Sequence, residues 1–245
     1  MSASISETGH AKNIANFQDL ISFCQGYGTI YNPTKELLKI PQLQLLYQTS
    51  LNSLNTAKTG KTNFDNATNE RRNSFSNLKP LSTKVINSFA VSGVDNLTLL
   101  DAKTINKKLQ GTRKKSDEEA TSTNATPTTR ISTSQQSYDR LIDHFSSLIF
   151  LLEQNLVYNP NEEDLKVTSL QAKLNDLQSK NTNLINAYTS YSNSLINRNF
   201  ELYNSPASLV KVSKEVKQYV KSIFGAKSPQ YKQVSSLEFK VIKAE

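Results

Sequence analysis

A chain of 245 residues with 36% hydrophobic content is long enough for one or two domains and too apolar for a wholly disordered protein. Its single cysteine excludes a disulfide within the chain, and only seven glycines and seven prolines favour long helices. A formal net charge of +8 favours an anionic partner such as nucleic acid, a ribosome or a membrane surface, although a lysine-rich solvated surface gives the same balance.

The first residues, MSASISETGHAKN, contain no charged segment followed by an apolar one and do not resemble a signal peptide, so we expect a cytoplasmic protein. The longest apolar cluster, SSLIFLLEQNLVY from Ser146, is interrupted at Glu153, well short of the roughly 18 residues that a membrane span requires. We therefore expect no transmembrane segment and interpret the cluster as one face of a buried helix.

A first helix is predicted over residues 14–27, because apolar side chains recur there at helical spacing. Cys24 lies on this apolar face and is interpreted as a small buried side chain rather than a reactive thiol. The helix is expected to end at Tyr31, Asn32 and Pro33, since proline disfavours helix in the residue before it and asparagine favours turns.

The phrase IYNPTKELLKIPQLQ, from Ile30 to Gln44, returns as VYNPNEEDLKVTSLQ from Val157 to Gln171, an offset of 127 residues. Similarity extends upstream, where NFQDLISFCQGYGTIYNP aligns with DHFSSLIFLLEQNLVYNP. We interpret the chain as an internal duplication in which the repeated phrase forms the same turn twice. A counterpart of the first helix is accordingly predicted over residues 138–152.

The second helix of each copy is predicted to be unusually long, about 34 residues or 50 Å at 1.5 Å per residue. In the second copy it follows a heptad-like seam over residues 170–202, with Ser169 as its N-cap. The equivalent seam over residues 43–75 places Pro41 in the first turn. This seam is more polar in the middle and contains Gly60, so we expect a looser helix there.

A third helix is predicted in each copy. The first covers residues 80–93, and the second has Ser205 as N-cap, Pro206 in its first turn and Gly225 after its end. The conformation of the segments that follow Gly93 and Gly225 is left open. The second of these segments alternates polar and apolar residues, which fits an extended strand of chain lying on the bundle.

These elements predict an all-α fold of two three-helix modules, residues 1–110 and 137–245, each with one long helix. Two short helices laid end to end match one long helix in length. We therefore expect the modules to pack face to face about a pseudo-twofold axis, as an elongated bundle with one shared core. Residues 111–136 are polar, lack aromatic side chains and are predicted to form a flexible linker.

No catalytic signature is present in the sequence, which has no glycine-rich phosphate loop, no nucleophile elbow and no cluster of histidine and cysteine. His10 is placed in an N-terminal arm and His144 beside an apolar helix face, and neither has a ligand-type residue at metal-binding spacing. We therefore predict a protein that is not an enzyme and has no catalytic residue, cofactor or metal site.

Lysines are the candidate functional residues. Four of them recur at helical spacing on the last predicted helix, and two more stand near the end of the first module: Lys211, Lys214, Lys217, Lys221, Lys107 and Lys108. Such side chains contact phosphates, and Tyr231 adds a ring on which a base can stack. The alternative is that they form an ordinary solvated helix face.

Arg71 and Arg198 occupy equivalent positions on the two long seams, where an apolar residue is expected. One interpretation is that the aliphatic stem of each packs on its neighbours while the guanidinium reaches water. A sharper hypothesis is that both arginines meet near the pseudo-axis, where they need an acidic partner or backbone carbonyls.

Two segments, GHAKNIANFQDLISFCQGYGTIYNP from Gly9 and GAKSPQYKQVSSLEF from Gly225, resemble an uncharacterised family of bacterial duplicated helical proteins. The resemblance covers essentially the full chain. It implies a bacterial origin and carries no activity over.

The function expected from the sequence is that of a non-enzymatic helical interaction or scaffold protein, whose partner and oligomeric state the residues do not identify. The alternative is a basic protein that binds nucleic acid or the ribosome through its lysines. A third class, a membrane-active helical bundle, would require release of the apolar residues 148–152, which are better explained as core.

Overall fold

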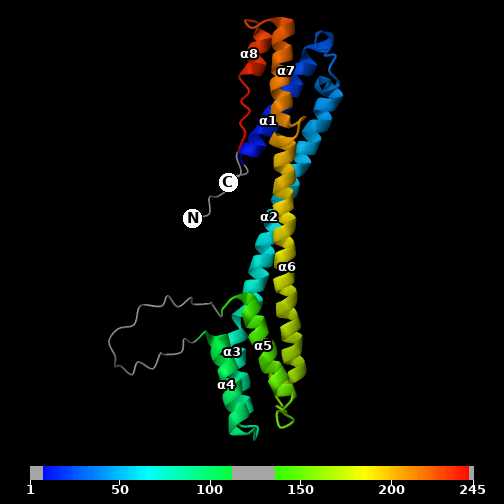
Figure 1. Cartoon of the computed structure of the whole chain (residues 1–245). Helices are drawn as coiled ribbons and strands as arrows, with labels where there is room; N and C mark the ends of the chain where they lie inside the picture. The colour runs from blue at the N-terminus through cyan, green and yellow to red at the C-terminus, as the bar shows by residue number, and fades with distance from the viewer. Residues whose placement is uncertain (1–7, 112–135, 243–245) are drawn as a thin grey trace, which may run out of the picture. The chain divides into compact units, whose positions relative to one another are not determined.

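The computed structural model describes residues 8–111 and 136–242, which fold into helices with no strand among them (Figure 1). This confirms the predicted all-α fold. The helices are α1 (Thr8–Gly26), α2 (Ile40–Ser76), α3 (Leu78–Ala90), α4 (Asn96–Gln110), α5 (Tyr138–Glu153), α6 (Val167–Asn199), α7 (Leu209–Phe224) and α8 (Pro229–Ser235). The predicted linker lies outside the described residues, apart from its ends at Gly111 and Gln136.

The chain divides into two compact units. Unit 1 comprises residues 1–64 with 187–245, and unit 2 comprises residues 65–186. Unit 1 combines α1 with α7 and α8, whereas unit 2 combines α5 with α3 and α4. Each unit therefore takes its first helix from one half of the chain and its third helix from the other half, a division that the sequence did not suggest.

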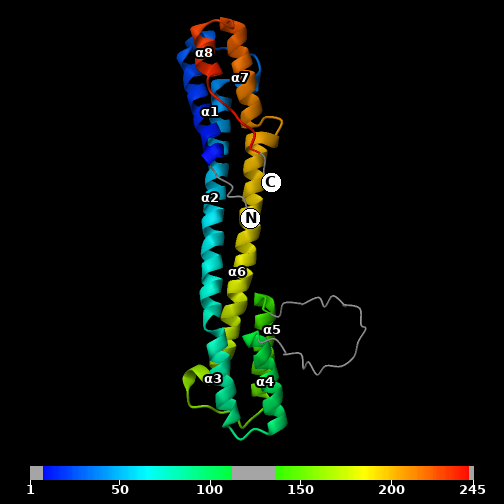
Figure 2. The ribbon, with the colours of Figure 1, turned by 90° about the vertical axis from the view of Figure 1, so that its left-hand side faces the viewer.

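The core of unit 1 is built by apolar faces that meet across nearly two hundred residues of sequence. Figures 1 and 2 show α1, α7 and α8 beside one another, and their buried side chains form one cluster. Phe17 and Leu20 of α1 are buried in it together with Val216 and Val220 of α7 and Val234 of α8. Because each of these helices has one apolar stripe, none of them buries its stripe without the others.

The segment that follows α8 lies along α1. The side-chain amide of Asn13 donates to the carbonyl of Lys240 at 2.7 Å and accepts from its backbone N–H at 3.1 Å. Asn16 donates to the carbonyl of Glu238 at 2.7 Å. Asparagine side chains thus satisfy backbone groups that have no helical partner. After the short helix α8, Ser236 and Leu237 form a turn and a bend, and residues 238–242, without regular secondary structure, are where a segment lying on the bundle was expected.

The core of unit 2 joins α3, α4, α5 and the first part of α6. The segment after Gly93, whose conformation the sequence did not indicate, forms α4. Asp95 caps this helix, since its carboxylate accepts from the backbone N–H groups of Leu97 and Thr98, and Gly111 ends it with a left-handed φ of 74°. Ala102 and Leu109 are buried on its inner face.

The repeated phrase forms the same turn in both units. The hydroxyl of Tyr31 donates to the carbonyl of Leu38 at 2.7 Å, and the hydroxyl of Tyr158 donates to that of Leu165 at 2.8 Å. Each tyrosine precedes one turn of 3₁₀ helix, Glu36–Leu38 or Glu163–Leu165. The two turns are therefore alike in detail, while duplication of the whole chain and its pseudo-twofold arrangement remain predictions.

Two predicted helix starts are wrong. Helix α6 begins at Val167, two residues before its expected cap at Ser169. Helix α7 begins at Leu209 after Ser208 rather than after Ser205, because the chain first passes through a π-helix, Phe200–Asn204, that is closed by the 2.9 Å bond from the N–H of Ser205 to the carbonyl of Phe200.

Gly60 has a packing role. Helix α2 continues through it, and a Cβ added there would lie 3.2 Å from both the Cα of Tyr191 and the Oγ of Ser194. Glycine therefore permits the backbones of α2 and α6 to approach closely within unit 1.

Because each core draws on both halves of the chain, we predict that residues 1–111 and 136–245 will assemble when they are produced together as separate polypeptides. An affinity tag on one piece should retain the other, and circular dichroism of the pair should match the intact chain. Each piece alone should be poorly folded, since its apolar helix faces lack partners. Pieces that fold alone and elute separately would contradict this arrangement.

We also predict that loss of the tyrosine hydroxyl lowers the stability of the protein equally at the two turns. Tyr31→Phe and Tyr158→Phe each leave a buried carbonyl without its donor and should each lower the free energy of unfolding by about 1–2 kcal/mol in urea titrations. Tyr188→Phe is the control, because its side chain is exposed. A loss at one turn with none at the other would mean that the two turns are not equivalent.

Candidate functional site

Two lysines of the predicted stripe on α7 donate hydrogen bonds to backbone carbonyls within unit 1. Lys211 donates to the carbonyls of Asn204 at 3.3 Å and Ser205 at 3.0 Å, at the end of the π-helix. Lys217 donates to the carbonyl of Leu237, where the chain leaves α8. Both ammonium groups therefore donate to backbone carbonyls close to the ends of helical segments.

The members of the stripe differ in exposure. Lys217 is half-buried 5.1 Å from the ring of Phe239, and burial lowers the pKa of its amine. Lys221 lies 5.8 Å from the ring of Tyr231, which places a cation where base stacking was expected. Lys214 is exposed. Lys211, Lys214 and Lys221 are thus the exposed members of the stripe, and their contact with an anion stays a prediction.

Lys107 and Lys108 lie in the last turn of α4, in unit 2. Both side chains are exposed, and positive charge at this position favours the C-terminal end of a helix. Their placement is consistent with a local structural role as well as with anion contact.

Excess positive charge is confined to unit 1. Residues 8–64 and 187–242 contain 13 lysines and arginines against five aspartates and glutamates, a balance of +8. Residues 65–111 and 136–186 contain 11 of each, a balance of zero. In the part of the chain that the structure describes, the basic character inferred from composition therefore belongs to one unit only.

Arg198 is in unit 1 and is 1% exposed, so the interpretation that its guanidinium reaches water is wrong. Its Nε and Nη2 donate to the side-chain oxygen of Asn199 at 3.2 and 2.9 Å. A buried arginine requires such acceptors because desolvation of its charge is costly.

Arg71 is in unit 2 and has different partners. It donates to the amide oxygen of Asn181 at 3.0 Å, and Asn181 donates in turn to the carboxylate of Asp139 at 2.8 Å. Its guanidinium carbon lies 3.9 Å from the centroid of the Tyr138 ring. Arg71 therefore meets an acidic group through an amide relay and a cation–π contact. The proposed meeting of the two arginines stays a prediction.

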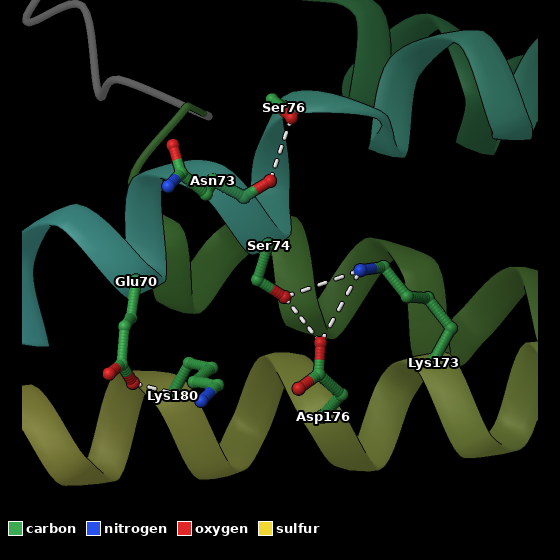
Figure 3. Close-up of polar contacts among 7 residues, drawn as sticks. All are labelled: Glu70, Asn73, Ser74, Ser76, Lys173, Asp176 and Lys180. Carbon is green, nitrogen blue, oxygen red and sulfur yellow. Dashed lines mark hydrogen bonds and ion pairs between the residues drawn. The ribbon is translucent and has the colours of Figure 1, made fainter.

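A polar layer joins the last part of α2 to the first part of α6, within unit 2 (Figure 3). The hydroxyl of Ser74 donates to the carboxylate of Asp176 at 2.5 Å, and the ammonium of Lys173 lies 3.2 and 3.4 Å from the same two groups. Glu70 and Lys180 form an ion pair at 2.9 Å. Sequence reasoning missed this layer, because its partners on α2 and α6 are about a hundred residues apart and share no local spacing.

The histidines are both buried in helices. His10 lies within α1 rather than in an N-terminal arm, and its Nδ1 is 2.7 Å from the hydroxyl of Tyr203. Burial, followed by the nearby Lys108, lowers the pKa of His144. Among the described residues no group of three or more histidine, cysteine, aspartate and glutamate side chains is arranged to hold a metal ion.

Cys24 is buried, as predicted, and burial raises the pKa of its thiol to about 12. Since the thiolate is the reactive form, the folded protein presents a poor nucleophile at this position.

Comparison of the chain with family models, curated proteins and solved structures found no match. The bacterial resemblance therefore remains a prediction. None of the helices in the described ranges combines the length and the apolarity that a membrane crossing requires.

The polar layer yields a titration test. The Ser74 hydroxyl, more than the neighbouring lysines, lowers the pKa of Asp176 below its usual range. Folding is stabilised by this shift above the pKa of the unfolded carboxyl, about 3.9, and the contribution is lost as pH falls through the folded pKa. Ser74→Ala should raise the pKa of Asp176 toward its usual value, as measured by NMR of the carboxyl carbon.

Ser76→Ala is the matched control, because the Ser76 hydroxyl donates to the carbonyl of Asn73 and not to Asp176 (Figure 3). It should leave the titration of Asp176 unchanged. An unaltered pKa in Ser74→Ala would show that this hydroxyl does not govern the carboxylate.

Proposed function

We propose that this protein is a non-enzymatic helical interaction protein and that unit 1 binds nucleic acid through its phosphates. The observation that supports this most is the confinement of the +8 charge balance to residues 8–64 and 187–242. A charge excess gathered on one compact unit raises the local potential far more than the same charges spread over the chain.

The acidic groups of unit 1 leave this excess largely uncompensated. Glu36, Glu215 and Glu238 each pair with a lysine of the same unit. Exposed lysines occur on α1, on α2, on α7 and around α8: Lys12, Lys58, Lys61, Lys214, Lys221, Lys227 and Lys232. Lysine ammonium groups contact phosphate as point charges, without reading the bases.

Sequence-independent binding is the expected mode. Binding of this kind gains most of its free energy from release of the cations that surround the polyanion, so it weakens steeply as salt increases.

The test is fluorescence anisotropy with labelled duplex DNA and RNA over a salt series. We expect the logarithm of the affinity to fall linearly with the logarithm of the salt concentration. The variant Lys214→Glu, Lys227→Glu, Lys232→Glu should weaken binding at least tenfold at about 0.15 M salt, where screening acts over about 8 Å. Its salt slope should decrease by up to about three.

The matched control reverses three lysines of α4 in unit 2: Lys103→Glu, Lys107→Glu, Lys108→Glu. The net charge changes equally, so a general electrostatic effect would weaken binding to the same extent. We expect the control to bind within about twofold of the parent chain. Equal losses, or no binding at about 0.05 M salt where the interaction is strongest, would refute the proposal.

A further inference from the structure

Unit 2 has an exposed end built from two connections. The α3–α4 and α5–α6 connections lie together in both views of the ribbon (Figures 1 and 2). The rings of Phe89 and Tyr158 are 5.7 Å apart, and Lys84 pairs with Asp164 at 3.4 Å. We define residues 84–101 and 153–166 as the unit 2 end.

Large apolar side chains project from the unit 2 end into solvent. Leu156 is 95% exposed, Val91 84% and Leu97 75%. A monomer gains nothing by exposing such side chains in one region, and grouped exposure marks surfaces that bind other proteins.

The unit 2 end is also acidic. It contains six carboxylates and two lysines, a balance of −4: Asp95, Asp101, Glu153, Glu162, Glu163 and Asp164 against Lys84 and Lys166. This local charge is opposite in sign to that of unit 1, although unit 2 as a whole is neutral over its described residues.

Unit 1 has an end of the same construction. Its α1–α2 and α7–α8 connections lie together, as the 5.1 Å separation of the Tyr27 and Phe224 rings and the ion pair of Lys35 with Glu215 require. We define residues 27–39 and 215–232 as the unit 1 end. Ile30 is 60% exposed there, and Leu37 is exposed as well.

The unit 1 end carries the reverse charge. It contains six lysines and two glutamates, a balance of +4: Lys35, Lys39, Lys217, Lys221, Lys227 and Lys232 against Glu36 and Glu215. The repeated turn therefore occurs once in a basic apolar end and once in an acidic apolar end.

We propose that the unit 2 end of one molecule binds the unit 1 end of a second copy of this chain. The two ends offer opposite net charges of equal size and exposed aliphatic side chains to bury between them. The charges would steer and orient the encounter, while burial of Leu156, Leu97 and Ile30 would supply the affinity.

The contact joins two different surfaces, so a linear assembly of bound copies keeps one unused unit 1 end and one unused unit 2 end at its two termini. Such heterologous contacts build rings where the rotation closes and open chains where it does not. This inference goes beyond the binding of nucleic acid and does not depend on it.

Sedimentation velocity of the full chain at increasing concentration provides the test. The weight-average mass should rise with concentration, and association should weaken at least tenfold at about 1 M salt, where screening acts over about 3 Å. Leu97→Ser, Leu156→Ser should weaken it as well. A monomer up to about 0.1 mM, where even weak contacts populate a complex, would overturn the proposal.

Charge reversal makes the test specific. Asp101→Lys, Glu153→Lys, Glu162→Lys alters only the unit 2 end, and Lys221→Glu, Lys227→Glu, Lys232→Glu alters only the unit 1 end. Each variant alone should be monomeric, because its two ends then carry charge of the same sign. An equimolar mixture should assemble, because each end of one variant again meets an oppositely charged end of the other.

Lys12→Glu, Lys58→Glu is the control within unit 1 and should associate like the parent chain. Unchanged association of the two end variants, or a mixture that stays monomeric, would overturn the inference. The unit 2 end variant should keep its affinity for duplex DNA, so loss of self-association and loss of nucleic-acid binding are measured separately.

Discussion

The structure depends on one constraint: α1 and α5 each bury an apolar stripe against a helix from the other half of the chain. Helix α1 covers its stripe with α7, and α5 covers its stripe in a cluster shared with α3. In each unit the stripe is thus covered by a helix from the other half of the chain, and without that helix it would face water. Helices α2 and α6 each contribute residues to both units.

This core arrangement also decides which polar side chains stay available. Lys217 lies against the ring of Phe239 and donates a hydrogen bond to the carbonyl of Leu237, and Arg198 is buried beside Asn199. A basic residue on a helical stripe is therefore not by itself evidence of ligand binding. Backbone carbonyls at helix ends also need hydrogen-bond donors, and a lysine can supply one. Exposed lysines occur in both units, and over the described residues it is the net excess of positive charge that belongs to unit 1.

The repeated turn shows how one local structure can carry opposite surfaces. Its backbone is held by a tyrosine hydroxyl on a leucine carbonyl, at Tyr31 in one unit and Tyr158 in the other. The exposed positions beside it do not contribute to that bond. Lysines flank the first turn and carboxylates flank the second. Either charge is tolerated, because charge at a solvated position changes the stability of the turn little. Two ends of opposite net charge thus share one turn structure.

The sequence by itself determined the elements: helical spacing located α1 and α5, proline and asparagine located the turns, and the apolar surroundings of Cys24 implied its burial. These features follow from residues within one or two helical turns of each other, where periodicity and turn chemistry act directly. Only the tertiary structure decided that His10 meets Tyr203, that Ser74 meets Asp176 and that the net charge belongs to one unit. Each of these depends on residues a hundred or more positions apart, and contact at that range is set by the packing of helix faces rather than by any local pattern.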